Sequence, residues 1–570
     1  MTERDPRTMR AARVDGKLSV AGAIAQLLAE MGARRCFGVL GTANFKITDA
    51  LCGAGVQYIP ARHEGNAASM GDAYARLSDE LVLVSVHSGP GLSNAITGIG
   101  EAAKSRTPLL ILAGDVATGD LRSNFYIEQA EMVRAVGATF ERTHSPKTAL
   151  RDATRAARAV VQDRRTVVLS LPVDVQDADL PIAYEYERGV IHSTLPAPDP
   201  KAIAAAAEEL SRSKRPLILA GRGAVVAKAK QSLVSLADEV GALLATSAFA
   251  HGLFADCPWS LGISGGFASP AALELIPQSD FILGFGVSFT HWTTRKGTLI
   301  GKDTRLLQVD VDASRLGANR RIDYTIVGDA RLTAEALRTE LRQRTSTPGR
   351  ATGWRNESVS QRIAQGGTHD LVYNDTSTSD HIDPRTLTKA LDAILPLERV
   401  VVSDSGHFMG WPPLYFRVPD ERGWCQLASF QSVGLGLASA IGAALAQPER
   451  LVVLAIGDGG LLMSLGELET AARLRLRMCV VIYNDLAYGA EVHYFGRRGY
   501  RTDIVKFPNV DFSAIAKSFG ASAIEARTPA DLAPVQAWAA EGAPGLFVID
   551  ARVNPNLEAE WHQDAFKVSE

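Results

Sequence analysis

The stretch Leu451-Val452-Val453-Leu454-Ala455-Ile456-Gly457-Asp458-Gly459-Gly460 predicts a buried strand that runs into a tight turn. Three of its last four residues are glycines, which let the chain turn sharply. Leucine and alanine then recur at helical spacing through 461–476, and a second apolar run, 479–483, predicts another strand. The stretch is therefore expected to be a β-turn-α-β unit with parallel strands.

An acidic residue follows each of these two strands. Asp458 and Asp485 are 27 positions apart, and parallel strands bring their carboxyl ends to the edge where open α/β sheets bind ligands. Carboxylate oxygens, with the amide of Asn484 beside them, suit Mg²⁺, and a glycine turn before a helix suits a phosphate. The residues thus indicate a magnesium–diphosphate site. The alternative is a strand-end turn with two solvated aspartates.

Gly457-Asp458-Gly459, followed some two dozen residues later by Asn484-Asp485, resembles the signature of thiamine-diphosphate enzymes. The resemblance implies that Asp458, Asp485 and the main-chain carbonyl of Ala487 are metal ligands. It also places Gly457, Gly459 and Gly460 in the cofactor site. This chain departs from the family at Asp485, where asparagine is more common. Aspartate still supplies a hard oxygen, so we expect metal binding to survive.

A second part of the resemblance lies near the N-terminus. Arg62-His63-Glu64 before a helix of small residues is similar to the acetolactate-synthase-like branch, with its benzaldehyde lyase and 2-hydroxyacyl-CoA lyase relatives. There, the glutamate hydrogen-bonds the aminopyrimidine of the cofactor, which implies a catalytic and cofactor-binding role for Glu64. By residue type alone, Glu64 would be a residue that stabilises the helix dipole. Gly41 and Val433 also match cofactor-binding positions. Val433 is either the wedge that bends the cofactor or a core valine.

The substrate-facing positions differ from those of acetolactate synthases. Ala490, Glu491 and Tyr494 stand where those enzymes carry Met, Val and Trp. Glu491 and His493 are candidates for moving protons beside a reactive carbanion, the alternative being a solvated helix face. His87 is a further catalytic candidate, because relatives have small polar residues around its loop.

Strands alternate with helices along the chain, which predicts an α/β fold with three doubly wound parallel-sheet domains. The expected divisions are a pyrimidine-binding domain at 1–185, a central domain at 186–345, a linker at 346–383, and a diphosphate-binding domain at 384–570. The first and third domains are candidates for structural cousins. In the central domain, Gly221-Arg222-Gly223 after a strand permits FAD or a nucleotide without compelling it, and a tight turn is the favoured interpretation.

Composition narrows the function classes. A net charge of −3 gives no reason to expect nucleic acid or an anionic membrane as a partner, and no apolar run is long enough to span a bilayer. Residues 1–16 lack the apolar core of a secretory signal. Five scattered cysteines without metal spacing indicate reduced thiols, so we expect a cytoplasmic location.

The resemblance covers about 17–556 and implies an enzyme that forms or cleaves a C–C bond next to a carbonyl. Decarboxylation of a 2-oxo acid with carboligation is the favoured reaction. The alternative is a lyase acting on a 2-hydroxy ketone or 2-hydroxyacyl-CoA. A non-catalytic regulator would be expected to have lost Glu64, Asp458 or the glycine turn, and all are present. The family's active sites lie between subunits, which implies a homodimer or homotetramer acting on a small-molecule substrate.

Overall fold

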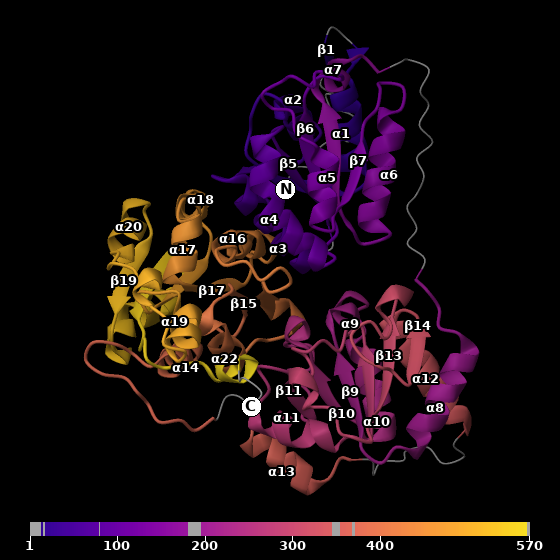
Figure 1. Ribbon diagram of the computed structural model, residues 1–570, viewed down its shortest axis with the longest axis vertical. Helices are drawn as coiled ribbons and strands as arrows, with labels where there is room; N and C mark the ends of the chain where they lie inside the picture. Colours follow the sequence, from indigo (N-terminus) through magenta and orange to yellow (C-terminus); the bar gives the residue numbers. More distant parts are fainter. Residues whose placement is uncertain are drawn as a thin grey trace.

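Three six-stranded sheets, each flanked by helices, form the architecture in this computed structural model (Figure 1). The structure describes residues 13–14, 17–78, 80–180, 195–344, 354–367 and 371–566. Every neighbouring pair of strands within the three sheets is parallel. Parallel sheets bury both faces, which explains the nearly continuous apolar runs of their central strands. The three-domain α/β prediction is confirmed.

The N-terminal sheet has the order β4-β3-β5-β6-β8-β7. Its strands are β3 Ala33–Gly38, β4 Gln57–Pro60, β5 Leu81–Val86, β6 Leu109–Asp115, β7 Thr139–Arg142 and β8 Thr166–Pro172. The helices are α1 Val20–Glu30, α2 Phe45–Gly53, α3 Glu64–Leu77, α4 Pro90–Lys104, α5 Gln129–Ala135, α6 Ala149–Val161 and α7 Val173–Asp177. A short antiparallel pair, β1 Arg13–Val14 and β2 Lys17–Leu18, precedes them.

The central sheet has the order β11-β10-β9-β12-β13-β14, which is the arrangement of dinucleotide-binding folds. Its strands are β9 Pro216–Ala220, β10 Leu243–Thr246, β11 Ser260–Ile263, β12 Phe281–Phe285, β13 Arg305–Asp310 and β14 Tyr324–Val327. The helices are α8 Pro200–Arg212, α9 Arg222–Val226, α10 Lys230–Val240, α11 Pro270–Leu275 and α12 Ala330–Arg344. A further helix, α13 Glu357–Gln365, lies in the stretch expected to be a linker.

The C-terminal sheet has the order β16-β15-β17-β18-β20-β19. Its strands are β15 Arg399–Ser403, β16 Trp424–Gln426, β17 Leu451–Gly457, β18 Met478–Asn484, β19 Ser522–Ala526 and β20 Leu546–Arg552. The helices are α14 Pro384–Ile394, α15 Trp411–Tyr415, α16 Gly436–Ala446, α17 Asp458–Ser464, α18 Glu467–Arg473, α19 Gly489–Gly496, α20 Phe512–Ser518, α21 Ala533–Ala540 and α22 Glu560–Ala565, and η5 His407–Gly410 is a 3₁₀ turn. When the strands of each sheet are numbered along the chain, the first and third sheets have the same order, 2-1-3-4-6-5. This agrees with the expectation that the two domains are structurally related.

The helix expected over 461–476 is divided into α17 and α18 by Leu465 and Gly466. Gly466 faces the N-terminal domain, where a Cβ would lie 3.6 Å from the Arg62 Cβ. Glycine is a poor former of helix interiors. The interruption therefore falls where this helix meets the other domain.

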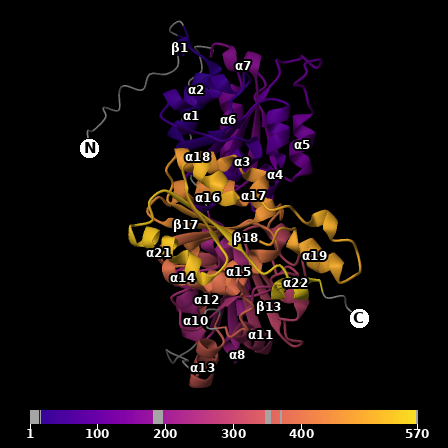
Figure 2. The same ribbon diagram turned by 90° about the vertical axis from the view of Figure 1, so that its left-hand side faces the viewer.

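Helices α3 and α16 join the N-terminal and C-terminal domains, and they lie side by side in Figures 1 and 2. Apolar residues of both domains form one continuous core around them. The backbones approach so closely that a Cβ on Gly442 would lie 2.1 Å from the Met70 carbonyl oxygen. Among the described residues, no helix is both long and apolar enough to cross a membrane.

Candidate active site

Asp458 and Asp485 lie at the same edge of the C-terminal sheet. Strands β17 and β18 pair in parallel up to Gly457 and Tyr483, so both chains leave the sheet at one level. Asp458 is the first residue of α17 and is 4% exposed. The predicted convergence of the two carboxylates on one edge agrees with the pairing register.

The two carboxylates interact electrostatically. Burial raises the pKa of Asp458 to about 7. Burial, and then the charge of Asp458, raise the pKa of Asp485 well above its usual range. Two nearby buried carboxylates resist being ionised together unless a cation neutralises them. The donor set therefore fits a divalent cation.

The loop after β18 is held in a strained conformation next to Asp485. Leu486 has a φ of +59°, in the left-handed region that is costly for leucine. Its carbonyl accepts a hydrogen bond from Phe507 N at 2.7 Å, and Ala487 N donates to Asp485 Oδ1 at 3.2 Å. Such strain persists where the surroundings hold it, often at functional sites. The loop is thus locked in a conformation that brings Ala487 close to Asp485.

The side-chain amide of Asn484 is engaged elsewhere, because its Nδ2 donates a hydrogen bond to Asp550 Oδ1 at 2.7 Å. Within the described ranges, no cluster of three or more His, Cys, Asp or Glu side chains is arranged to hold a metal. A cation at Asp458 and Asp485 would therefore complete its shell with main-chain oxygen, water and phosphate, as Mg²⁺ commonly does.

Gly459 and Gly460 are pressed between side chains of the site. A Cβ on Gly459 would lie 2.6 Å from Tyr488 Cε1, and one on Gly460 would lie 2.7 Å from Asp404 Oδ2 and 3.4 Å from Val433 Cγ1. Any larger residue at these positions would clash. Val433 thus lies next to the glycine turn. This position is compatible with the wedge that bends the cofactor and also with a core packing role.

Asp404 is a site residue that the sequence did not reveal. It follows β15, the neighbour of β17, and its Oδ2 accepts a hydrogen bond from Gly434 N at 2.9 Å. Burial raises the pKa of Asp404 to about 7, and its Oδ1 is buried with no hydrogen-bond partner in the described structure. The only available signal was its position just after the short apolar run Val400-Val401-Val402. An unpaired buried carboxyl oxygen is one more place for a ligand donor.

The N-terminal candidates also meet at a sheet edge. A Cβ on Gly41 would lie 2.2 Å from the His87 ring, so only glycine admits this imidazole. His87 Nδ1 donates to the Ser88 carbonyl at 2.8 Å, and its Nε2 lies 3.2 Å from Thr42 Oγ1. Glu64 is half-buried, and its Oε2 accepts from Asn94 Nδ2 at 3.0 Å. Gly41, Glu64 and His87 are therefore grouped around one loop edge.

The segment before α3 is fixed to the C-terminal domain. The buried Glu467 accepts hydrogen bonds from Arg62 N at 2.8 Å and Asn66 Nδ2 at 3.1 Å. His63 caps α3 through its Nδ1, which accepts from Gly65 N at 3.1 Å. Glu64 thus starts a helix that is held at its first turn by both domains. Glu467 is a further residue whose role the sequence did not show.

Glu491 and His493 point in different directions on α19. Glu491 is exposed, whereas the His493 ring stacks on His407 with centroids 4.5 Å apart. The structure therefore does not join them as a pair, and it does not bring His493 to His87. Their catalytic roles remain predictions.

Family models match the chain in three places. They describe thiamine pyrophosphate enzymes: the N-terminal TPP binding domain at residues 18–135, the central domain at 203–337, and the C-terminal TPP binding domain at 404–551. Together they span more than half of the chain. The protein belongs to the thiamine pyrophosphate enzyme family. It is an enzyme that uses thiamine diphosphate to act on a small-molecule substrate.

Relatives of this family cover almost the whole chain. A probable sulfoacetaldehyde acetyltransferase of Rhizobium meliloti is 26% identical and covers 97% of each chain. An acetolactate synthase large subunit of Haemophilus influenzae is 28% identical over 90% of this chain and 91% of its own. The solved structure of benzoylformate decarboxylase from Polynucleobacter necessarius has a TM-score of 0.80, covering 95% of this chain and 99% of its own, at 20% identity. That last likeness concerns the fold.

The glycines of the central domain are explained by packing. A Cβ on Gly221 would lie 2.1 Å from the Gly286 carbonyl oxygen, and one on Gly223 would lie 2.7 Å from Gly286 Cα. The turns after β9 and β12 therefore press against each other, which agrees with the tight-turn interpretation. Flavin or nucleotide binding at these turns stays a prediction from the sequence.

Proposed function

We propose that this enzyme decarboxylates a 2-oxo acid and transfers the remaining acyl unit to a carbonyl acceptor, using thiamine diphosphate and Mg²⁺. The observation that carries the proposal is the electrostatically interacting pair formed by the buried Asp458 and the partly buried Asp485 beside a glycine turn. A pair of this kind needs a cation, and a cation there would hold a diphosphate. Bound thiamine diphosphate supplies a carbon nucleophile and an electron sink for the carbanion.

Three groups of this chain are assigned to hold the metal and the diphosphate. Asp458, Asp485 and the Ala487 carbonyl would ligate Mg²⁺, and the backbone from Gly457 to Gly460 would approach the diphosphate. The N-terminus of α17 favours the negative charge. Asp404 and Val433 line the same turn, and Val433 is proposed to support the bent cofactor.

Glu64 is proposed as the group that exchanges a proton with the cofactor's aminopyrimidine. It is half-buried and oriented by Asn94, and its helix is tied to the C-terminal domain by Glu467. A carboxyl held in this way can give and take a proton at one place. His87, Glu491 and His493 are proposed to act on the substrate side of the site.

The relatives favour acyl transfer as the reaction. The name of one relative, an acetyltransferase, describes the transfer of an acetyl unit, and the name of another, an acetolactate synthase, describes the formation of acetolactate. The altered positions Ala490, Glu491 and Tyr494 support an acceptor different from that of acetolactate synthases. A charged Glu491 near the acceptor would disfavour an anionic one by like-charge repulsion.

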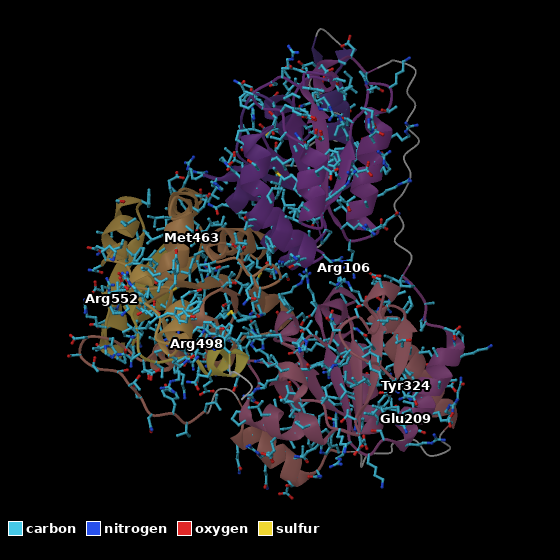
Figure 3. All side chains as sticks on the ribbon, in the orientation of Figure 1. Arg106, Glu209, Tyr324, Met463, Arg498 and Arg552 are labelled. Atoms are coloured by element: carbon cyan, nitrogen blue, oxygen red, sulfur yellow. The ribbon has the colours of Figure 1, made fainter. Side chains whose placement is uncertain are left out.

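We also propose that the active site lies between two copies of the chain, in a homodimer or homotetramer. Large apolar side chains are exposed near both edges: Leu40, Phe45 and Phe125 near the N-terminal edge, and Leu462 and Met463 on α17. Figure 3 shows Met463 on the C-terminal domain near its boundary with the N-terminal one. Exposed apolar groups gathered around a polar site indicate a subunit interface. A cytoplasmic location stays a prediction from the cysteine pattern.

The test is CO₂ release from pyruvate by the purified protein supplied with thiamine diphosphate and Mg²⁺, with candidate aldehyde and 2-oxo acid acceptors. The proposal predicts release that depends on both additions and increases with the correct acceptor. If the cofactor binds but neither pyruvate nor bulkier 2-oxo acids release CO₂, the decarboxylation proposal is wrong. Cleavage of a 2-hydroxy ketone or 2-hydroxyacyl-CoA under the same conditions would replace it with the lyase.

A further inference from the structure

The chain after β20 returns across the carboxyl edge of the C-terminal sheet. Val553 N donates to the Asn484 carbonyl at 3.1 Å, beside the proposed metal loop. Further on, Ala559 N donates to His407 Nε2 at 2.9 Å, and Trp561 Nε1 donates to the His407 carbonyl at 3.0 Å. This tail, residues 554–566, is therefore seated on η5, the turn that follows Asp404.

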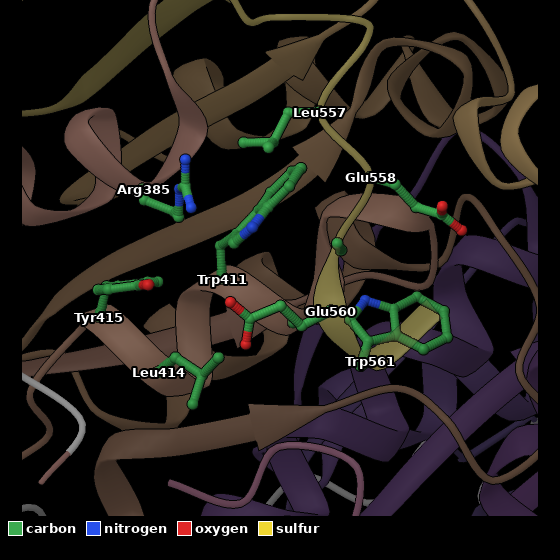
Figure 4. A pocket seen from close by; sticks show the side chains of 10 residues that line it. Arg385, Trp411, Leu414, Tyr415, Leu557, Glu558, Glu560 and Trp561 are labelled. Atoms are coloured by element: carbon green, nitrogen blue, oxygen red, sulfur yellow. The ribbon is translucent and has the colours of Figure 1, made fainter. Parts of the chain in front are cut away.

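The surface of η5 and α15 is complementary in shape to the tail. A Cβ on Gly410 would lie 2.1 Å from Trp561 Cδ1, so the indole occupies the space that any other residue at 410 would fill. The cavity left between the tail and α15 has a volume of about 20 Å³ (Figure 4). That is room for one water molecule and not for a substrate. The tail is therefore closely packed onto η5 and α15.

The same tail also holds α19. Glu558 pairs with Arg497 Nη2 at 2.9 Å and accepts a hydrogen bond from His562 Nδ1 at 2.6 Å. Arg497 Nε donates to the His493 carbonyl at 3.1 Å. Phe566 contacts Tyr494 with ring centroids 4.8 Å apart. The tail thus contacts α19, the helix that carries the substrate-side candidates Glu491 and His493, through an ion pair and an aromatic contact.

Three imidazoles complete the connection. His407 stacks on His493, and His562 meets His407 edge-on with ring centroids 5.5 Å apart. Burial lowers the pKa of His407 well below its usual value, and also lowers the pKa of His493, which keeps these two rings neutral and able to stack. We call His407, His493, Arg497, Glu558 and His562 the histidine clasp. Its contacts form a closed ring from η5 through α19 to the tail.

Two ring nitrogens of the histidine clasp lack hydrogen-bond partners, which is unusual for residues that only stabilise the fold. The Nε2 atoms of His493 and His562 are buried without a hydrogen-bond partner in the described structure, and His562 is 0% exposed. A buried, unpaired nitrogen is destabilising, so an apolar ring would serve packing better. The choice of histidine at both positions points to a role beyond packing.

We propose that the tail is a positioning element of the active site, in which Glu558 and His562 fix His493 and α19 relative to the proposed metal loop. The inference rests on the proposed function, because it takes α19 as the substrate-side wall. Glu558 and His562 are positioning residues, since they act through His493 and Arg497. A merely structural tail would change stability without changing how α19 meets a substrate.

The test uses four variants of the full-length protein loaded with thiamine diphosphate and Mg²⁺. His562→Phe keeps the ring shape but loses the bond to Glu558, whereas His562→Asn keeps a donor near the Nδ1 position. Glu558→Gln removes the ion pair to Arg497. Glu560→Gln is the matched control: Glu560 is exposed, two residues along the same tail, and points toward Leu414 and Tyr415, away from Glu558 (Figure 4).

The readouts are steady-state kinetics of CO₂ release and hydrogen exchange of the 489–498 amides. We expect His562→Phe and Glu558→Gln to raise KM for the 2-oxo acid roughly tenfold, with a smaller change in kcat, and to speed exchange in α19. His562→Asn should recover most of the loss, and Glu560→Gln should match the unaltered protein. Cofactor affinity by titration calorimetry should stay unchanged in all four.

The proposal is overturned if His562→Phe leaves both KM and α19 exchange unaltered, or if His562→Asn is as impaired as His562→Phe. It is also overturned if Glu560→Gln has the same effects as Glu558→Gln. Failure of the proposed function gives a different result, namely no CO₂ release by the unaltered protein. Hydrogen exchange with bound cofactor then still decides whether the histidine clasp orders α19.

Discussion

The N-terminal and C-terminal sheets have the same strand order, but the buried aspartates at their carboxyl edges have different partners. Asp115, at the end of β6, pairs with Arg142 at 2.8 Å and accepts from Ser170 Oγ at 2.9 Å. Asp458 directly follows β17 and has Asp485 as a neighbour. Burial raises the pKa of Asp458, and burial followed by the charge of Asp458 raises the pKa of Asp485. One edge neutralises its acid with Arg142 of the same domain, and the other is proposed to take up an external cation.

This difference teaches that topology provides the edge and the side chains decide its chemistry. The N-terminal edge carries Gly41, Glu64 and His87, groups suited to hydrogen bonding and proton transfer. The C-terminal edge carries carboxylates and a glycine turn, which suit a metal and a diphosphate. A cofactor with a heterocycle at one end and a diphosphate at the other suits these two edges, the heterocycle at the N-terminal edge and the diphosphate at the C-terminal edge.

The largest effect is expected from Glu64→Gln, which removes the proton-exchanging group of the N-terminal edge while keeping its size. We expect kcat for CO₂ release to fall by about 10²–10⁴-fold, because a positioned acid–base group contributes on this order. Steady-state assays with saturating cofactor measure it. Glu131→Gln, an exposed glutamate of the same domain, is the control. Unchanged kcat in Glu64→Gln would refute the role given to Glu64.

The acidic C-terminal edge should make the apo protein sensitive to pH. The folded-state pKa of Asp458 is about 7, above the unfolded value near 4. The folded apo protein therefore holds more protons between about pH 4 and 7, and its free energy of unfolding should fall as pH rises through this window, by at most on the order of 4 kcal/mol.

Mg²⁺ with thiamine diphosphate should reverse this trend, because bound cation stabilises the ionised carboxylates. Thermal unfolding of apo and loaded protein at pH 5 and pH 7.5 measures both effects. Loaded protein should gain most at pH 7.5. An apo protein whose unfolding temperature rises steadily from pH 5 to 7.5, with no larger gain on loading at pH 7.5, would argue against the carboxylate pair.

The contact between the N-terminal and C-terminal domains offers a pair of matched glycines. Gly442→Ala forces a Cβ against the Met70 carbonyl oxygen at 2.1 Å, whereas Gly466→Ala places one at 3.6 Å from the Arg62 Cβ, an ordinary contact. We expect Gly442→Ala to lower the free energy of unfolding by about 1–3 kcal/mol through overpacking. Gly466→Ala should stay within about 0.5 kcal/mol. Denaturant unfolding compares them, and equal losses would contradict the close α3–α16 packing.

A smaller effect is expected from Arg142→Met, which makes the N-terminal edge resemble the C-terminal one. The change leaves Asp115 with only the Ser170 hydroxyl as a polar side-chain partner among the described hydrogen bonds. Because Arg142 is partly exposed, water should offset part of the loss, so we expect about 1–2 kcal/mol of destabilisation at pH 7. Denaturant unfolding measures the loss. A free energy of unfolding equal to that of the unaltered protein would show that the ion pair is unimportant.

The sequence predicted the parts of the fold and site that depend on local pattern. Apolar runs located β17 and β18, and their spacing placed Asp458 and Asp485 on one edge. The strands β16 and β19, three and five residues long, are too short to give a recognisable pattern in the sequence. Asp404 was missed because a lone aspartate after a strand has no distinguishing neighbour in sequence.

The histidine clasp depends on contacts between distant parts of the chain, which no local pattern reveals. His407 and His562 meet only because β15 and β20 belong to one sheet and the tail folds back over it. His493 was expected to face the substrate, and its stacking on His407 became visible only in the structure. Residues whose roles arise from the return of the tail are therefore the ones that sequence reasoning could not reach.

Titration calorimetry with thiamine diphosphate, in the presence and absence of Mg²⁺, tests the central claim most directly. The account predicts that the unaltered protein binds the cofactor only with the metal. It predicts that Asp458→Ala loses on the order of 100-fold or more in affinity, while Glu64→Gln keeps most of it. Binding that is independent of Mg²⁺, or unaltered affinity in Asp458→Ala, would contradict the assignment of the acidic edge as the metal–diphosphate site.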